Sequence, residues 1–315
     1  GATTGASSKV FYWNRSRGCA LKGLRLMGNG DISHSIFGTQ TGNNYMLGID
    51  CDGVSTACND NVFENLMLTK ALSDANSTVG IRFQEVGSAN SSENVIRGCS
   101  FAIGSGVAIR MNQANAKNIR ISNSSFDGAG TCIQIANGGS FQADRCTSTG
   151  CTNIISGIWT DPILINQWYD EGSTTFYNGS PNLPIKFIAC HFGDIGSYNN
   201  FLVFDGTAPT GVFFDSCVWP DTEPTATLAR GACLPFRAVS ASNSLSLTCF
   251  NCQFPNDNNY LTAISTFLGD KSIFGCTVGT ETIAGASTTI VAPAPAAGAT
   301  TFDVASAAGI AAGNF

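Results

Sequence analysis

The sequence contains little charge and no concentration of positive charge. Asp, Glu, Lys and Arg make up 12% of its 315 residues, and the net charge is −6, whereas charged residues usually make up about a quarter of a soluble domain. The few cations are scattered, as at Lys9, Arg15, Arg17 and Lys22. Proteins that bind nucleic acid cluster Lys and Arg to contact phosphates. The sequence therefore predicts that nucleic acid is not a partner.

Long hydrophobic runs are also missing. No segment approaches the run of about 18 apolar residues that crosses a bilayer as a helix, so we expect no membrane insertion. The sequence starts at Gly1 without the charged segment and apolar core of a secretion signal. This start indicates that the sequence is a piece of a longer protein.

Histidine is scarce, and the common catalytic motifs are absent. The two histidines are His34 and His191, and there is no GxSxG, HExxH, Walker or helix-opening GxGxxG motif. A CxxC pair occurs once, from Cys249 to Cys252, without a second pair to complete a zinc site. These absences disfavour a serine hydrolase and a zinc protein. The sequence predicts no metal and no cofactor.

Glycine, small polar residues and cysteine are abundant instead. The sequence contains 35 Gly and 13 Cys, and 43% of its residues are hydrophobic. This composition is typical of a β-rich protein with many turns. Several cysteines stand two residues before a large apolar residue, as in Cys190-His191-Phe192. The recurrence indicates an internal repeat.

Alignment of the repeats on the residue that precedes the cysteine gives ten repeat positions, six of which are followed by Cys. Seven of the ten are Asn or Gly, which tolerate a left-handed backbone. The residue two positions earlier is apolar in every repeat, and the residue three positions later is usually large and apolar. The ten positions are Gly23, Asn65, Gly98, Asn123, Arg145, Asn166, Ala189, Ser216, Asn251 and Gly275.

Each repeat therefore consists of short strands joined at a left-handed corner. Such a unit cannot bury its inward face alone, so consecutive units must stack. The sequence predicts an all-β fold, a right-handed single-stranded parallel β-helix of about ten rungs with lateral loop excursions such as residues 28–60. A β-propeller is disfavoured because each blade needs about 40 residues and four strands. We expect the cysteines to form a reduced ladder inside, where a small apolar side chain fits.

The composition along the chain predicts three segments. Residues 1–20 form an N-terminal cap, and residues 21–280 form the parallel β-helix. Residues 281–315 are rich in Ala, Gly and Pro and lack the repeat, which indicates a linker or the start of a truncated C-terminal domain.

One lateral edge of the predicted β-helix gathers candidate functional residues. Outward side chains of adjacent rungs lie about 4.8 Å apart, and retaining and inverting glycosidases separate their carboxylates by about 5 Å and about 6.5–9.5 Å. Crowding also raises the pKa of a carboxyl group, as a general acid requires. Because turns favour Asp, some clustering is expected without function. The predicted catalytic residues are Asp170, Glu171 and Asp194, and the predicted substrate-binding residues are Trp168, His191, Trp219 and Asp221.

Two other groups of acids are weaker candidates. Asp144 and Asp215 lie near Arg145 in a second outward column, with two rungs between them. Four acids of the N-terminal excursion could bind a cation or a sugar, although they lack the spacing of an EF-hand. These four are Asp31, Asp50, Asp52 and Asp60.

From about residue 10 to 280, the chain resembles the right-handed β-helix body of bacteriophage tailspikes and their polysaccharide depolymerases, in the pectate-lyase-like superfamily. The resemblance is carried by the Asn/Gly corner column, by the I-x-I-x-N-x-x-F pattern from Ile119 to Phe126, and by VFYWNRSRGCALKGLRLMGNGD at residues 10–31. The Ala-rich tail is similar to connector segments of phage tail proteins. The sequence does not contain the arginine-and-calcium constellation of a pectate lyase.

The resemblance implies a homotrimer on a phage tail, outside the cell, that binds a capsule, lipopolysaccharide or exopolysaccharide of a bacterial host. It also implies cleavage by paired Asp and Glu, although the catalytic acids of this group follow no fixed motif. The main expectation is therefore an endo-acting glycoside hydrolase. Two alternatives stay open, a receptor-binding or structural spike without catalysis and a secreted polysaccharide lyase.

Overall fold

The chain divides into two compact units, an N-terminal unit of Gly1–Asp161 and a C-terminal unit of Pro162–Phe315. The computed structural model describes residues 9–14, 16–27, 47–54, 58–69, 79–86, 91–112, 115–135, 139–159, 161–181, 184–193, 201–205, 211–219, 236–239, 245–254, 263–278, 281–282 and 286–288.

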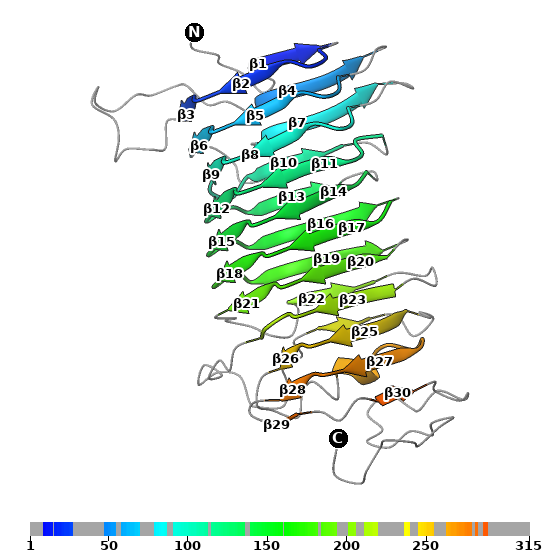
Figure 1. Ribbon diagram of the computed structural model, residues 1–315. Helices are drawn as coiled ribbons and strands as arrows, with labels where there is room; N and C mark the ends of the chain where they lie inside the picture. Colours follow the sequence, from blue (N-terminus) through cyan, green and yellow to red (C-terminus); the bar gives the residue numbers. More distant parts are fainter. Residues whose placement is uncertain are drawn as a thin grey trace. The chain divides into compact units, whose positions relative to one another are not determined.

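The N-terminal unit consists of three parallel sheets whose strands follow one another coil by coil (Figure 1). The first sheet contains β1 (Lys9–Asn14), β4 (Leu47–Val54), β7 (Val79–Val86), β10 (Val107–Met111), β13 (Thr131–Ile135) and β16 (Asn153–Trp159). The second contains β2 (Ala20–Lys22), β5 (Val62–Glu64), β8 (Val95–Arg97), β11 (Ile119–Ser122) and β14 (Phe141–Asp144). The third contains β3 (Arg25–Met27), β6 (Met67–Thr69), β9 (Ser100–Ala102), β12 (Ser125–Asp127) and β15 (Thr147–Thr149).

The C-terminal unit repeats this arrangement. Its first sheet contains β19 (Thr175–Pro181), β22 (Leu202–Phe204) and β24 (Arg237–Ala238). Its second contains β17 (Ile163–Asn166), β20 (Ile185–Ile188), β23 (Gly211–Asp215), β25 (Ser246–Phe250) and β27 (Lys271–Phe274), with β30 (Ala286–Thr288) antiparallel to β27. On the third side lie β18 (Tyr169–Glu171) and β21 (His191–Gly193), then β26 (Gln253–Phe254) and β28 (Thr277–Val278), with β29 (Glu281–Thr282) antiparallel to β28.

The predicted all-β parallel β-helix is confirmed. In the described residues, the second sheet has five strands in the N-terminal unit and five parallel strands in the C-terminal unit, which accounts for the ten predicted repeats. Matching positions stack in register, as Phe187 does on Phe214 with ring centroids 5.0 Å apart. The described helical structure is confined to one turn at residues 263–265. The predicted segment boundaries at residues 20 and 280 stay predictions.

The left-handed corners explain the repeat. Nine of the ten predicted positions have φ between 47° and 64°. The exception is the sixth repeat, where Gln167 (φ 51°) forms the corner and Asn166 is the last residue of β17. Because successive side chains of a strand point to opposite faces, this shift by one residue inverts every neighbouring assignment. Ile165 is therefore buried in place of Leu164.

The alignment missed two further columns of left-handed corners. One column lies five residues before the corner column predicted from the sequence, and the other follows the strands of the third sheet. Each coil therefore turns three times, once between each pair of sheets. The earlier column contains Gly18, Asp60, Glu93 and Asn118, and the later one contains Gly104, Gly128, Gly150 and Gly172.

Cysteine recurs because it suits the position after a corner. The expected reduced interior ladder is confirmed for the described side chains, of which ten cysteines are buried and Cys19 is exposed. Thiols after a corner donate to the carbonyl oxygen two residues earlier, as Cys99 does to Arg97 and Cys217 to Asp215, both at 3.5 Å. Ser124, in the same column, donates to the corresponding carbonyl oxygen at 2.9 Å. A thiol is small enough for the interior and still a weak donor.

The interior of both units is filled with side chains. The C-terminal unit is the more aromatic, and Phe187 has rings of Phe176, Phe192 and Phe204 within 6.4 Å of its own. Protein interiors packed in this way leave no space for a ligand. Binding must therefore take place on an outer face.

Candidate functional site

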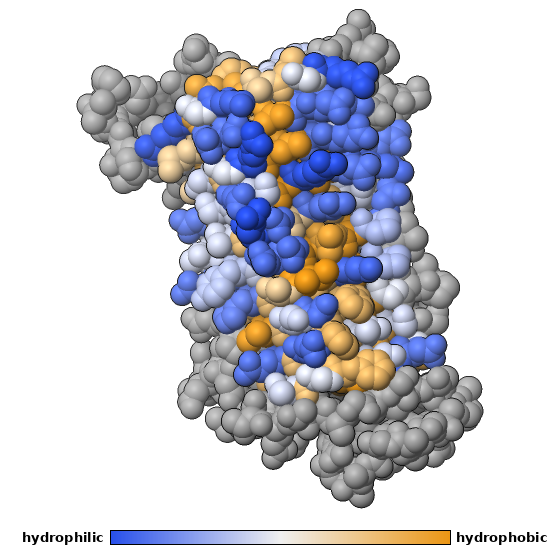
Figure 2. Space-filling model, in the orientation of Figure 1, coloured by the Kyte–Doolittle hydropathy of each residue, from blue (hydrophilic) through white to orange (hydrophobic). Residues whose placement is uncertain are grey.

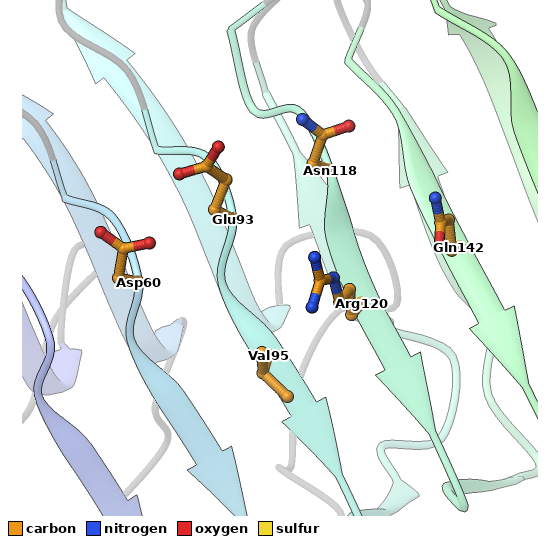
Figure 3. A pocket seen from close by; sticks show the side chains of 6 residues that line it. All are labelled: Asp60, Glu93, Val95, Asn118, Arg120 and Gln142. Carbon is orange, nitrogen blue, oxygen red and sulfur yellow. The ribbon is translucent and has the colours of Figure 1, made fainter.

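A groove of about 500 Å³ crosses the outer face of the second sheet in the N-terminal unit (Figure 3). It lies over β8, β11 and β14 and over the corners that precede β5, β8 and β11. Its lining combines two carboxylates, a guanidinium, two amides and one apolar side chain. The lining residues are Asp60, Glu93, Val95, Asn118, Arg120 and Gln142.

The coil register brings these residues together. Arg120 pairs in register with Val95 on one side and with Gln142 on the other, so the three outward side chains form one row. Asp60, Glu93 and Asn118 are consecutive members of the earlier corner column, with φ of 57°, 60° and 53°. Since adjacent parallel strands lie about 4.8 Å apart, the groove spans four coils.

Asp60 and Glu93 are held in place by a buried asparagine ladder. Asn61 and Asn94 directly follow them, and both are 0% exposed. The backbone N–H of Asn61 donates to Oδ1 of Asn94 at 3.0 Å. The side-chain amide of Asn94 donates to the carbonyl oxygens of Cys58 and Ser91, both at 3.1 Å. The left-handed backbone conformation is unfavourable for a glutamate by itself. The hydrogen bonds of Asn61 and Asn94 keep the corner at Glu93 in this conformation.

The charges of the groove are only partly neutralised. Nε of Arg17 lies 3.0 Å from Oδ2 of Asp60 in an exposed ion pair, the kind that contributes little to stability. Among the residues that the structure describes, Glu93 and Arg120 have no ion-pair partner. Figure 3 shows the carboxylates of Asp60 and Glu93 at the corners before neighbouring strands and the Arg120 guanidinium beside Val95.

This set of side chains fits a carbohydrate. Carboxylates and amides form hydrogen bonds with sugar hydroxyls, and Val95 offers an apolar surface to the C–H face of a ring. The backbones of Asp60 and Glu93 are one coil apart, a spacing of about 4.8 Å that is close to the shorter of the two carboxylate separations used for glycoside hydrolysis. The sequence indicates Asp60 as a possible sugar ligand and gives no such indication for Glu93 or Arg120.

The edge predicted from the sequence is largely turned inward. Trp168 and Trp219 are each 1% exposed and Asp170 is 0% exposed. The prediction that these three side chains face outward is therefore wrong. The corner at Gln167 places Trp168 and Asp170 in inward columns, and Ser173 donates to Oδ1 of Asp170 at 2.6 Å. Trp219 stacks on buried Phe254 with ring centroids 5.3 Å apart.

Part of this edge does reach the surface. Tyr169 is 46% exposed and stacks on His191 with ring centroids 4.6 Å apart and 11° between the planes. Burial lowers the pKa of His191. Glu171 is exposed and pairs in register with Gly193. Tyr169 is not among the site residues predicted from the sequence, and the corner at Gln167 places it in the outward column.

The remaining candidates that the structure describes make local contacts or lie within a strand. Asp194, Asp221 and Asp31 lie outside the described residues. Nε of Arg145 lies 2.8 Å from Oδ2 of Asp144, and Ser216 donates to Oδ1 of Asp215 at 2.9 Å. These interactions are local ones between sequence neighbours. Asp50 and Asp52 belong to β4, in register with Tyr12 and Asn14 of β1.

No three His, Cys, Asp or Glu side chains in the described part of the chain come close enough together to hold a metal ion. No described helix has the length and apolar character needed to cross a bilayer.

Comparison of the chain with family models, curated proteins and solved structures finds no match. The parallel β-solenoid is consistent with the fold of pectate-lyase-like and tailspike proteins.

Proposed function

We propose that this chain is the body of a phage tailspike-like protein that binds a bacterial surface polysaccharide in the groove and cleaves it there as an endo-glycosidase. The observation that carries the proposal is the placement of Asp60 and Glu93 on adjacent coils of one groove, beside amide and apolar side chains. A homotrimer located on the phage tail belongs to the same proposal.

The two carboxylates have different surroundings, which suggests different roles. Glu93 lacks a cationic partner among the described residues and is the proton donor to the glycosidic oxygen. Asp60, beside Arg17, is the carboxylate that attacks the anomeric carbon as the glycosidic bond breaks. Glu93 then takes a proton from water, and the water oxygen displaces Asp60 to release the product. One coil of separation, about 4.8 Å, favours this retaining route over an inverting one.

The Arg17–Asp60 ion pair favours a second candidate, a spike that binds the polysaccharide without cutting it. An ion pair that occupies one carboxylate leaves the groove suited to hydrogen bonding and less suited to nucleophilic attack. A polysaccharide lyase stays a third expectation. Product analysis separates the three, because a hydrolase releases reducing ends and a lyase releases unsaturated sugars that absorb ultraviolet light.

The test uses surface polysaccharides purified from a panel of bacterial strains. We expect the wild type to release oligosaccharides from one of them, and D60N and E93Q each to lower the rate about 10²- to 10⁴-fold. D127N is the matched control, because Asp127 is an exposed acid of β12 outside the groove. Binding by the wild type without release would favour the spike. Unchanged rates in both D60N and E93Q would contradict the choice of residues.

A further inference from the structure

Arg120 differs from the other cations around the second sheet of the N-terminal unit. Each of those cations has a carboxylate within 3.0 Å. Arg120 is exposed and, within the described part of the chain, has neither an ion pair nor a side-chain hydrogen bond. The paired cations are Arg17 with Asp60, Lys22 and Arg97 with Glu64, Lys117 with Asp161, and Arg145 with Asp144.

The unpaired guanidinium lies on the groove floor. Arg120 is flanked in register by Val95 and Gln142, and Figure 3 shows its guanidinium lying towards β8. Glu93 lines the same groove, yet no ion pair joins it to Arg120. The groove therefore presents one unpaired cation and one unpaired anion at separate places, each open to a ligand.

A guanidinium binds a carboxylate through two parallel hydrogen bonds. With the acids Asp60 and Glu93 beside it, a single guanidinium matches a ligand group with one negative charge. A doubly charged phosphate would be repelled more strongly by the same two acids. The neighbouring amides of Asn118 and Gln142 fit hydroxyl groups on the same sugar.

We propose that the polysaccharide bound in the groove is acidic, and that Arg120 binds the carboxylate of one of its sugars. This inference rests on the proposed function and adds the class of substrate to it. Arg120 is a specificity-determining residue, distinct from the two carboxylates assigned to the reaction.

The experiment compares one polysaccharide in two forms. The probe is the purified polysaccharide that the wild type binds, before and after its carboxyl groups are reduced to alcohols with carbodiimide and borohydride. Reduction should weaken wild-type binding about 10- to 100-fold, the range for a hydrogen-bonded ion pair. R120Q should bind the native polymer as weakly as the wild type binds the reduced one, and reduction should change R120Q binding little. R120K should lie between.

R145Q is the matched control, since Arg145 is an exposed arginine of the same unit that is paired with Asp144 outside the groove. It should behave as the wild type does. Equal wild-type affinity for native and reduced polymer, or equal losses in R120Q and R145Q, would overturn the inference and leave the proposed function standing. Binding of no polysaccharide in either form would overturn the proposed function and the inference together.

Discussion

The second sheets of the two units have similar inward faces and different outward faces. In the N-terminal unit the outward column before the corner is largely charged, with Lys22, Glu64 and Arg97 in adjacent coils. In the C-terminal unit the same column contains Phe250 and Phe274, which are 43% and 37% exposed and pair in register. Figure 2 shows hydrophilic surface dominating where the N-terminal strands are drawn, and more hydrophobic surface where the C-terminal strands are drawn.

This difference shows which positions the fold constrains. Inward side chains must fill a closed stack, so the same residue types return in every coil. Outward side chains have no such requirement and can vary from one unit to the next. The groove lies on the charged outer face of the N-terminal unit, and we therefore expect the binding site there.

The largest expected effect is on the inward face. Phe187→Ala should lower the free energy of unfolding by about 3–5 kcal/mol, because it leaves a cavity among stacked rings. Phe250→Ala, on the outward face of the same sheet, should lower it by less than about 1 kcal/mol. Denaturant unfolding of both variants measures the difference. Similar losses would contradict the division between constrained and unconstrained faces.

A smaller effect tests the corrected corner of the sixth repeat. Gln167→Gly should stabilise the protein by about 1 kcal/mol, because glycine adopts the left-handed backbone without the clash of a Cβ atom. Asn166→Gly should destabilise it by about 0.5–1 kcal/mol, since Asn166 is in a strand. Thermal unfolding measures both changes. Destabilisation by Gln167→Gly together with stabilisation by Asn166→Gly would mean that Asn166 forms the corner and that Trp168 is exposed.

The charged column should make the N-terminal unit sensitive to acid. Hydrogen bonds from Arg97 and Lys22 lower the pKa of Glu64 to about 2, from 4.5. A carboxyl group whose pKa is lower in the folded state stabilises the fold above the unfolded value and loses this contribution as the pH falls. Stability should therefore decline from about pH 4.5 towards pH 2, and less so in Glu64→Gln. Melting temperatures across this range test it, and equal declines in both proteins would contradict it.

The smallest expected effect is on thiol reactivity. Burial raises the pKa of Cys146 to about 12 and also raises that of Cys249, and a protonated, buried thiol reacts slowly. In the folded protein, iodoacetamide should modify the exposed Cys19 and leave these two unmodified. Mass spectrometry of labelled peptides gives the answer. Fast labelling of Cys146 or Cys249 would mean that the interior ladder is open to solvent.

The sequence predicted the fold well because corners and inward columns leave a strong pattern. It failed at Asn166, where asparagine suits a left-handed corner and the corner nonetheless falls on Gln167. That one residue placed Trp168 on the wrong face. The groove was harder to predict, because the corner column that contains Asp60 and Glu93 shares no single residue type: its members are Gly18, Asp60, Glu93 and Asn118. Asp60 and Glu93 each stand five residues before a predicted corner, at Asn65 and Gly98, and this constant spacing is the signal that aligns them.

The measurement that tests the account most directly is carboxyl footprinting with and without the bound oligosaccharide. Carbodiimide coupling followed by mass spectrometry reports which acids the ligand covers. We expect the oligosaccharide to protect Asp60 and Glu93 and to leave Glu171, on the C-terminal unit, as reactive as before. Protection of Glu171 with unchanged labelling of Asp60 and Glu93 would contradict the groove as the polysaccharide site.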